Sequence, residues 1–465
     1  MEQNGTQIRQ RVVLVVAPFQ GHITPILQIG SILHAKGFSI TIAHAEFNPP
    51  HSSNHPEFVF VPLSTNLSDY DIPSTFLSTM NVNCKEPLKT YVVQTLEKQE
   101  PRDRVCCIIY DSMMYFAEAV AADLKIPSIL YHNSSASYVL ARHATPRLHK
   151  QGYIPVQESM SNELVPELHP LRFKDLPFRQ ISETLLKLIA NGNNVRSSAA
   201  VICNTNDFLE HSQLSQLQEE CQVPIFSIGP LHKMAPASLT TSLLKEDTSC
   251  LAWLDNQAPK SVIYVSLGSV ATVDKKEITE TAWGLANSGQ PFLWILRPGM
   301  VLNSEDASDK WLDLLPEGFE ERVRERGLIV EWAPQKEVLS HSAVGGFFSH
   351  AGWNSALESL SEGVPMICRP CFADHHVNAR HITHVWKVGL EMDLVLEREG
   401  IERAIRRVML EKEGEEMRQR AIDMKQKIIT CVQKGGSADN SLNDLVELIS
   451  SKSNAKNDTA TLIES

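Results

Sequence analysis

One stretch, residues 332–375, constrains this chain more than any other. Its hydrophobic pattern predicts a loop, a short helix, a buried strand ending at His350, a second helix over 356–362, another strand over 364–368 and a closing loop. The corner between the buried strand and the second helix is rich in glycine and small polar residues. Backbone N–H groups at a helix start attract anions, so this corner predicts a pyrophosphate site.

Candidate partners for the rest of a nucleotide sugar follow in order along the same stretch. Trp332 and Pro334 offer a flat apolar wall on which a base can stack. Glu358, about one turn into the second helix, offers a carboxylate for two ribose hydroxyls. Asp374 and His375 close the final loop, where the far end of the ligand is expected. Base, ribose, diphosphate and sugar thus each have a candidate partner.

The stretch resembles the donor-binding signature of plant family-one UDP-dependent glycosyltransferases, which glycosylate small lipophilic molecules. The similarity extends to most of the chain, and runs such as PFQGHITPILQ and WLDNQAPKSVIYVSLGS resemble the branch with cytokinin and steviol glycoside glucosyltransferases. The resemblance implies UDP-sugar binding by Ser269, Trp332, Ala333, Gln335, His350, Gly352, Trp353, Asn354, Ser355, Glu358, Asp374 and His375.

Size and charge restrict the function class. A chain of 465 residues suggests two to three domains, and a net charge of −12 argues against nucleic acid and anionic membrane surfaces as partners. Nine cysteines without a paired framework fit a reducing compartment. The first apolar run, Val12–Val16, is too short for a signal peptide or a membrane span. We therefore expect a cytoplasmic protein without stable membrane insertion, and the resemblance implies a monomer.

Short apolar strands alternate with helical segments along the chain, which predicts α/β units with parallel sheets wound on both sides. The polar stretch 231–249 is interpreted as a linker. The expected fold is two Rossmann-like, doubly wound domains facing a cleft, the GT-B architecture that the resemblance also implies. Its expected parts are an acceptor domain (1–235), a donor domain (250–437), a helix at 438–451 packing back on the acceptor domain, and a disordered tail (452–465).

A histidine and an aspartate are the candidate catalytic pair. His22 lies in a tight loop after the first strand, before a helix expected to open at Pro25, and Asp111 ends another parallel strand. Both therefore belong to the carboxyl edge of one sheet, where α/β proteins bind ligands. A neutral imidazole can take the proton of an attacking hydroxyl, and a carboxylate can stabilise the imidazolium that forms. Capping of a helix is the competing interpretation for His22.

The expected reaction is one inverting displacement at the anomeric carbon. Negative charge on the departing UDP can be stabilised by His350, Asn354, Ser355 and the helix start. Ser269, by analogy with the family, is expected to touch the β-phosphate, and an ordinary helix N-cap is the competing interpretation. No D-x-D motif lies where a metal-dependent transferase uses one, so we predict no metal and no cofactor besides the UDP-sugar co-substrate.

Two departures from the family pattern concern the sugar. The signature ends Asp374-His375 where most members carry Asp-Gln, and Asn133 stands where relatives commonly carry Thr near the sugar C6 hydroxyl. UDP-glucose is the favoured donor. UDP-galactose or UDP-arabinose remains the alternative, because His occurs in members preferring those donors and an imidazole offers fewer hydrogen bonds than an amide. Ala351, where Cys or Asn is usual, is expected to leave the turn intact.

The acceptor is expected to be a hydrophobic plant metabolite, glycosylated on oxygen or nitrogen. Met113 and Met114 follow Asp111 and are candidates for an apolar acceptor pocket, because thioethers adapt to varied shapes. Tyr115 is a further candidate. For all three residues, packing in the core is the competing interpretation.

Three other function classes are alternatives to a glycosyltransferase. Cys368-x-x-Cys371 with nearby histidines suggests zinc or redox chemistry, but no second cysteine pair follows. A non-catalytic nucleotide-sugar-binding protein would lack the base, whereas His22 and Asp111 are present. A nicotinamide-dependent dehydrogenase would carry the G-x-G-x-x-G fingerprint after the first strand, and this chain does not.

Overall fold

The computed structural model describes residues 10–63, 73–98, 104–193, 195, 197–237, 241–301, 314–393 and 395–461. The chain divides into two compact units. The first draws on residues up to Pro155, on Gln180–Leu243 and on the chain from Thr430 onward, and the second on Val156–Arg179 and Leu244–Ile429. The segment 156–179 thus groups with the second unit, although the sequence suggested that it belonged to the acceptor domain.

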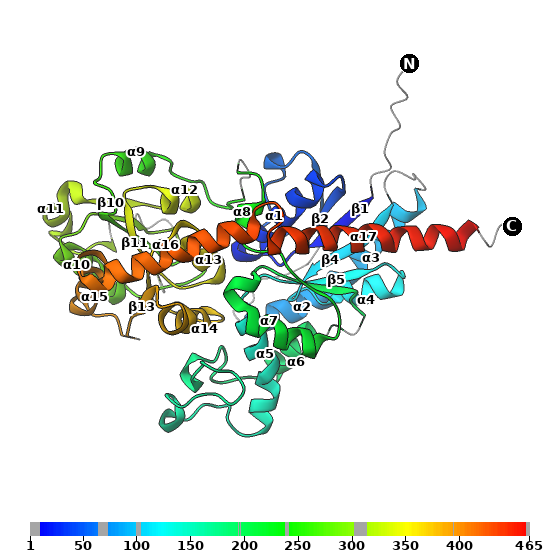
Figure 1. Cartoon of the computed structure of the whole chain (residues 1–465), viewed down its shortest axis with the longest axis horizontal. Helices are drawn as coiled ribbons and strands as arrows, with labels where there is room; N and C mark the ends of the chain where they lie inside the picture. Colours follow the sequence, from blue (N-terminus) through cyan, green and yellow to red (C-terminus); the bar gives the residue numbers. More distant parts are fainter. Residues whose placement is uncertain are drawn as a thin grey trace, which may run out of the picture. The chain divides into compact units, whose positions relative to one another are not determined.

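The first unit is built on a seven-stranded parallel sheet with the order β3-β2-β1-β4-β5-β6-β7 (Figure 1). Its strands are β1 (Arg11–Val15), β2 (Ser39–Ala45), β3 (Phe58–Leu63), β4 (Val105–Asp111), β5 (Ser128–His132), β6 (Ala200–Cys203) and β7 (Ile225–Ser227). Parallel strands buried on both faces are nearly all apolar, and β1 is buried throughout. The expected doubly wound, Rossmann-like fold is confirmed for this unit.

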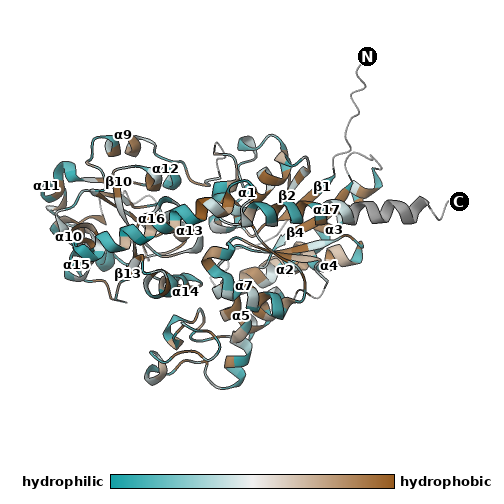
Figure 2. Ribbon diagram, viewed as in Figure 1, coloured by the Kyte–Doolittle hydropathy of each residue, from teal (hydrophilic) through white to brown (hydrophobic). Residues whose placement is uncertain are grey.

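The helices of this unit carry both hydrophilic and hydrophobic residues, as Figure 2 shows. They are α1 (Gln20–Ala35), α2 (Pro73–Asn83), α3 (Lys85–Glu97), α4 (Phe116–Asp123), α5 (Ala136–Lys150), α6 (Glu183–Gly192), α7 (Asp207–Cys221), α8 (Leu231–Met234) and α17 (Ser437–Thr461). The sequence pattern missed α7 because its periodicity breaks at Glu210, which has non-helical angles (φ −139°, ψ 39°). The Glu210 carboxylate instead accepts hydrogen bonds from the N–H groups of Ala136 and Ser137 at the start of α5.

The start of α1 differs from the expectation that Pro25 opens the helix. The carbonyl oxygen of Phe19 already accepts the N–H groups of His22 (2.8 Å) and Ile23 (2.9 Å), so the first turn is closed before the proline. The helix begins at Gln20, and Pro25 lies inside it. His22 is therefore a residue of the first helical turn rather than of a loop.

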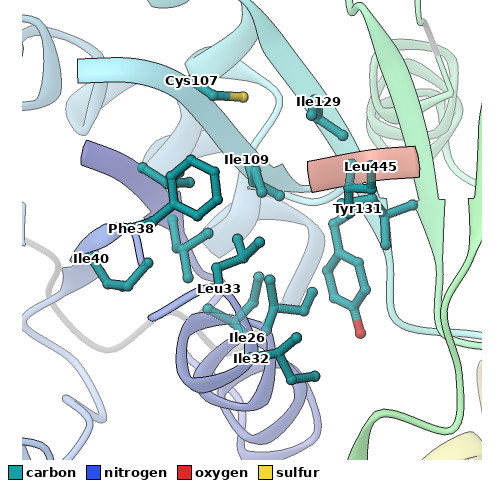
Figure 3. Packing of buried hydrophobic residues seen from close by; sticks show 14 of the residues in the cluster. Ile26, Ile32, Leu33, Phe38, Ile40, Cys107, Ile109, Ile129, Tyr131 and Leu445 are labelled. Carbon is teal, nitrogen blue, oxygen red and sulfur yellow. The ribbon is translucent and has the colours of Figure 1, made fainter. Parts of the chain in front are cut away.

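The core of the first unit lies between α1, the sheet and the C-terminal helix. Figure 3 shows Leu33 and Ile26 of α1 facing Ile109 of β4, with Leu445 of α17 close to Ile129 of β5, and all five belong to one buried cluster. Full burial of such side chains contributes about 1.5–3 kcal/mol each. The helix α17 runs to Thr461, beyond the expected start of the tail at 452, and residues 462–465 lie outside the described ranges.

The second unit contains a six-stranded parallel sheet with the order β10-β9-β8-β11-β12-β13. Its strands are β8 (Val262–Ser266), β9 (Phe292–Ile295), β10 (Gly327–Val330), β11 (Val344–Ser349), β12 (Met366–Cys368) and β13 (Gly389–Glu391). The helices are α9 (Ser249–Asp255), α10 (Lys275–Ser288), α11 (Phe319–Val323), α12 (Gln335–Ser340), α13 (Trp353–Glu362), α14 (His375–Arg380), α15 (Arg398–Leu410) and α16 (Lys412–Val432). The second Rossmann-like unit is thereby confirmed.

Polar contacts explain why the segment 156–179 groups with the second unit. Arg380 of α14 donates a hydrogen bond from Nε to the carbonyl oxygen of Pro170 (3.0 Å) and lies 3.7 Å from the Asp175 carboxylate. Asp175 is 1% exposed and also accepts two hydrogen bonds from the Arg172 guanidinium. A buried carboxylate needs such partners, so these arginines hold the segment in place.

Candidate active site

Each sheet has one point where the strand order reverses, and the predicted site residues gather there. In the first sheet that point lies between β1 and β4, and His22 follows β1 while Asp111 ends β4. In the second sheet it lies between β8 and β11, and Ser269 follows β8 while His350 follows β11. Open α/β sheets bind ligands outside the carboxyl ends of their strands at this reversal. Each unit thus has one candidate site.

The imidazole–carboxylate pair of the first unit is directly bonded. His22 Nδ1 lies 2.5 Å from Asp111 Oδ2, and Asp111 is fully buried. The other carboxylate oxygen, Oδ1, accepts the N–H of Met113 (2.9 Å), which fixes the plane of the carboxylate. Because the carboxylate can only accept, Nδ1 carries the proton and donates it, and Nε2 keeps a lone pair. This arrangement can remove a proton from a hydroxyl placed at Nε2.

The helix start makes the carboxylate important for charge balance. His22 lies in the first turn of α1, where the helix dipole is positive and disfavours a cation. An imidazolium formed there during a reaction gains a partner in Asp111. The pair therefore supports a change of charge on His22 that the helix alone would oppose.

The remaining predicted residues of the first unit differ in accessibility. Asn133 is partly exposed, and its Nδ2 donates to the carbonyl oxygen of Gly21 (3.3 Å). Met113 and Tyr115 are also partly exposed, so they can contribute to an acceptor surface. Met114 is fully buried and packs in the core, which is the competing interpretation that the sequence left open.

In the second unit the corner before α13 is shaped around His350. A Cβ atom on Gly268 would lie 2.7 Å from His350 ring atoms, and one on Gly352 would lie 2.5 Å from Nε2, so the ring needs glycine at both positions. Burial is the main cause that lowers the pKa of His350, to about 3, and the nearby His375 lowers it further. The imidazole is therefore neutral at pH 7 and can donate a hydrogen bond without carrying a charge.

The helix α13 begins at Trp353, three residues earlier than expected from the sequence. Gly352 is its N-cap residue, so Asn354 and Ser355 belong to the first turn rather than to the corner. Asn354 is partly exposed and Ser355 is 8% exposed. This ten-residue helix places two small polar side chains beside its positive end, which suits a pyrophosphate.

A glutamine links the predicted ribose and base positions. Gln335, at the start of α12, donates from Nε2 to Glu358 Oε2 (2.6 Å) and to Ser355 Oγ (3.0 Å). Its Oε1 accepts from the hydroxyl of Tyr264 (3.3 Å). Trp332 just before α12 is partly exposed, while Ala333 is buried. Gln335 thus connects the predicted ribose carboxylate, Glu358, to Ser355 at the helix start, while Pro334 of the predicted stacking wall is buried.

Asp374 ties the last loop to the helix start. Its Oδ2 accepts from the N–H of Trp353 (3.1 Å) and from Asn378 Nδ2 (2.7 Å). Burial raises the pKa of Asp374, and hydrogen bonding to Asn378 opposes that shift. Asn378 also donates to the carbonyl oxygen of Ala351 (3.0 Å), so it joins both sides of the corner. The other oxygen, Oδ1, lies 3.9 Å from His375 Nε2.

His375 has a defined tautomer. Its Nδ1 accepts from the N–H groups of Cys371 and Phe372, both at 3.3 Å, so the proton resides on Nε2. Burial lowers the pKa of His375 to about 3. The ring contacts that of His350 edge to face, with centroids 4.7 Å apart. His375 therefore offers one N–H donor and no charge at neutral pH.

Two positions carry a signal that the sequence analysis passed over or misassigned. No role in the site was assigned to Gly268 from the sequence. A glycine directly after a buried strand nevertheless indicates a positive φ, and the φ of Gly268 is 75°. The Ser269 N-cap interpretation is wrong, because the next helix, α10, has Asp274 as its N-cap residue. Ser269 lies in the turn after β8 and is partly exposed, so its hydroxyl remains available to a ligand at the strand end.

The two Rossmann-like units with parallel sheets are the architecture of the GT-B class of glycosyltransferases. The chain belongs to the UDP-glycosyltransferase family, since the family model described as UDP-glucoronosyl and UDP-glucosyl transferase matches residues 13–426. The recognition from the signature and the expected enzyme class are therefore confirmed.

Plant proteins are similar over nearly the whole chain. UDP-glycosyltransferase 76E1 of Solanum lycopersicum is 50% identical over 451 residues, covering 95% of this chain and 93% of the relative. Flavonol 3-O-glucosyltransferase UGT76E12 of Arabidopsis thaliana is 45% identical over 454 residues, covering 95% and 97%. The structure of Phytolacca americana UGT2 complexed with UDP-2fluoro-glucose and pterostilbene aligns with a TM-score of 0.81 at 26% identity, covering 96% and 100%.

Proposed function

We propose that the protein is an inverting UDP-glycosyltransferase in which His22 is the general base. Members of its family transfer a sugar from a UDP-sugar to small plant metabolites. The observation that carries the proposal is the 2.5 Å contact between His22 Nδ1 and Asp111 Oδ2, which leaves Nε2 as the proton acceptor. The acceptor hydroxyl loses its proton to Nε2 as its oxygen attacks the anomeric carbon, and the bond from that carbon to UDP breaks.

Charge on the departing UDP is balanced by protein groups in this proposal. The neutral His350 and the side chains of Asn354 and Ser355 lie at the start of α13, and Ser269 lies at the end of β8. Such preorganised donors act where charge develops and need no reorganisation during the reaction. We propose that no metal and no further cofactor takes part.

UDP-glucose is the proposed donor, and UDP-galactose or UDP-arabinose is the alternative. The amide of a glutamine can donate and accept at the same time, whereas His375 presents only its Nε2–H, because Nδ1 is bonded to two backbone N–H groups. Asp374 Oδ1 is the nearby acceptor. A sugar at this position therefore meets one donor and one carboxylate oxygen from these two residues.

The proposed acceptor is a small lipophilic plant metabolite with a hydroxyl or amine. One relative is named a flavonol 3-O-glucosyltransferase, and one similar structure contains pterostilbene. Within the described ranges, none of the helices has the length and apolar character needed to cross a bilayer. A monomeric, cytoplasmic enzyme without nucleic-acid partners is part of the proposal, and the net charge of −12 argues against nucleic acid as a partner.

A donor panel tests this proposal. The wild-type protein and His375→Gln would each receive a mixture of plant phenolics and terpenoids with UDP-glucose, UDP-galactose, UDP-arabinose or UDP-xylose, and products would be read by mass spectrometry. We expect glucosides from the wild type, with the glutamine variant at least as active on UDP-glucose. Galactosides or arabinosides in excess would select the alternative donor. No product from any donor, with UDP still bound, would contradict the proposal.

A further inference from the structure

Two consecutive residues in the first turn of α1 are tied to the carboxyl edge of the sheet. His22 bonds through its side chain to Asp111 at the end of β4 (2.5 Å). Gly21 accepts, at its carbonyl oxygen, a hydrogen bond from the side-chain amide of Asn133, just beyond β5 (3.3 Å). The strands β4 and β5 are neighbours in the sheet. The first turn of α1 is therefore bonded to residues at the carboxyl ends of two different strands.

The position of Pro25 explains why a side-chain donor is useful here. In an α-helix the carbonyl oxygen of residue i accepts the N–H of residue i+4. For Gly21 that residue is Pro25, which lies inside α1 and has no N–H. The amide nitrogen of Asn133 donates to the oxygen that the proline cannot serve.

We propose that Asn133 is a positioning residue of the transfer reaction: its bond to Gly21 fixes the first turn of α1 and so holds the His22 imidazole on Asp111 with Nε2 presented to the acceptor. This inference rests on the proposed role of His22 as the base. The bond acts one residue before His22, so a shift of the turn moves the Cα atom from which the imidazole projects. Small displacements of a base cost turnover far more than they cost binding.

Kinetics can distinguish this role from the sugar contact expected from the sequence. The bond to the Gly21 carbonyl oxygen uses one of the two N–H groups on Asn133 Nδ2, so it does not by itself exclude a sugar contact. A positioning role predicts a loss in kcat with unchanged KM for the UDP-sugar. A contact between Asn133 and the sugar predicts instead a raised KM for UDP-glucose or a changed ratio of glucose to galactose transfer.

A double-mutant cycle with Pro25 gives the sharpest test. Asn133→Ala should lower kcat about three- to tenfold, the range expected for one lost hydrogen bond. Pro25→Ala restores an N–H that can donate to the Gly21 carbonyl oxygen, so in that background Asn133→Ala should lower kcat by less than about twofold. KM for UDP-glucose and the stoichiometry of UDP binding by calorimetry should be unchanged in all four proteins.

Asn48→Gly is a matched control. It removes another side-chain amide bond of the same length, from Asn48 Nδ2 to the carbonyl oxygen of Pro18 (3.3 Å), and glycine suits the φ of 49° at that position. This bond precedes α1 and does not hold its first turn, so we expect kcat to stay within about twofold of the wild type.

The outcomes separate the inference from the proposed function. Equal losses from Asn133→Ala in the wild-type and the Pro25→Ala backgrounds, or a change in KM or donor ratio, would overturn the positioning role. An unchanged kcat in Asn133→Ala would overturn it as well. The proposed role of His22 as the base fails separately, if His22→Ala, measured in parallel, keeps its turnover with an unactivated alcohol.

Discussion

Replacing Asp111 with asparagine should be more harmful than replacing it with alanine, because of the hydrogen bond from Met113. The N–H of Met113 donates to Asp111 Oδ1 at 2.9 Å, while Oδ2 faces His22 Nδ1 at 2.5 Å. An asparagine keeps its carbonyl oxygen on the Met113 N–H, which places its NH₂ group against His22 Nδ1. That group donates to Nδ1 and forces the proton onto Nε2, where the base needs a lone pair.

The expected size of the effect follows from two contributions. Rotating the asparagine amide to restore the correct tautomer leaves the Met113 N–H without an acceptor, at a cost of about 1–3 kcal/mol. Loss of the carboxylate removes its stabilisation of the imidazolium, about 1.5–3 kcal/mol for a charge-assisted hydrogen bond. Together these reduce kcat on the order of 10³-fold for Asp111→Asn. In Asp111→Ala only the second contribution applies, and kcat falls about 10²-fold. The His22 imidazole of this variant can carry its proton on either ring nitrogen, so no tautomer is imposed.

Steady-state kinetics with UDP-glucose and a phenolic acceptor would measure both variants. A nitrophenol acceptor that is ionised at the assay pH is the control, since it needs no base, and both losses should shrink to about tenfold or less. Thermal melts check folding, where alanine is expected to be the less stable variant because it removes the acceptor of the Met113 N–H. Higher kcat in Asp111→Asn than in Asp111→Ala would show that the tautomer argument is wrong.

Three further outcomes are expected. Gly268→Ala should weaken UDP binding, measured by calorimetry, by about tenfold or more, because its Cβ would meet the His350 ring at 2.7 Å and φ is 75°; unchanged affinity would contradict the described corner. Ala351→Gly should change the free energy of unfolding in urea by less than about 0.5 kcal/mol, because relief of the φ of 63° is offset by the loss of a fully buried methyl group and by the greater entropy of the unfolded chain; a loss of more than about 1.5 kcal/mol would contradict this reasoning. The pKa values of His350 and His375 are lowered to about 3 and that of His381 to about 4, from 6.5 in the unfolded chain. The unfolded state therefore binds more protons below pH 6.5, so the free energy of unfolding should fall by up to about 1.4 kcal/mol per pH unit for each histidine, and a flat profile between pH 7 and 5 would contradict the burial of these rings.

Fully buried strands and long amphipathic helices were predictable from the sequence, because their pattern reflects burial directly. The strands β1, β4 and β8 are buried along their whole length and mainly apolar, with a polar or charged residue only at one end of each. The charged segment from Glu397 forms two helices as expected. Short edge strands were not predictable. The strands β7 and β13 have three residues each, too few for a pattern to stand out from the surrounding loops.

The candidate site was predictable as a set of residues but not as a set of contacts. The signature selected the corner around His350, yet it assigned the helix start three residues late, because small polar residues are also typical of turns. The helix at His22 was likewise expected to begin at Pro25, since proline favours the first helical turn. Bonds that join distant segments, such as that from Asn133 to Gly21, arise from strand order and leave no local pattern.

The central claim is that His22 is the general base of a UDP-sugar transfer. It is tested most directly by measuring both the turnover and the UDP affinity of one preparation of His22→Ala. Turnover of UDP-glucose with an unactivated alcohol should fall below detection, while calorimetry should give a UDP dissociation constant within about twofold of the wild type. Loss of the base without loss of UDP binding is expected because the predicted UDP-binding residues, from Ser269 to His375, all belong to the second unit. A variant that keeps most of its turnover would show that another group accepts the proton.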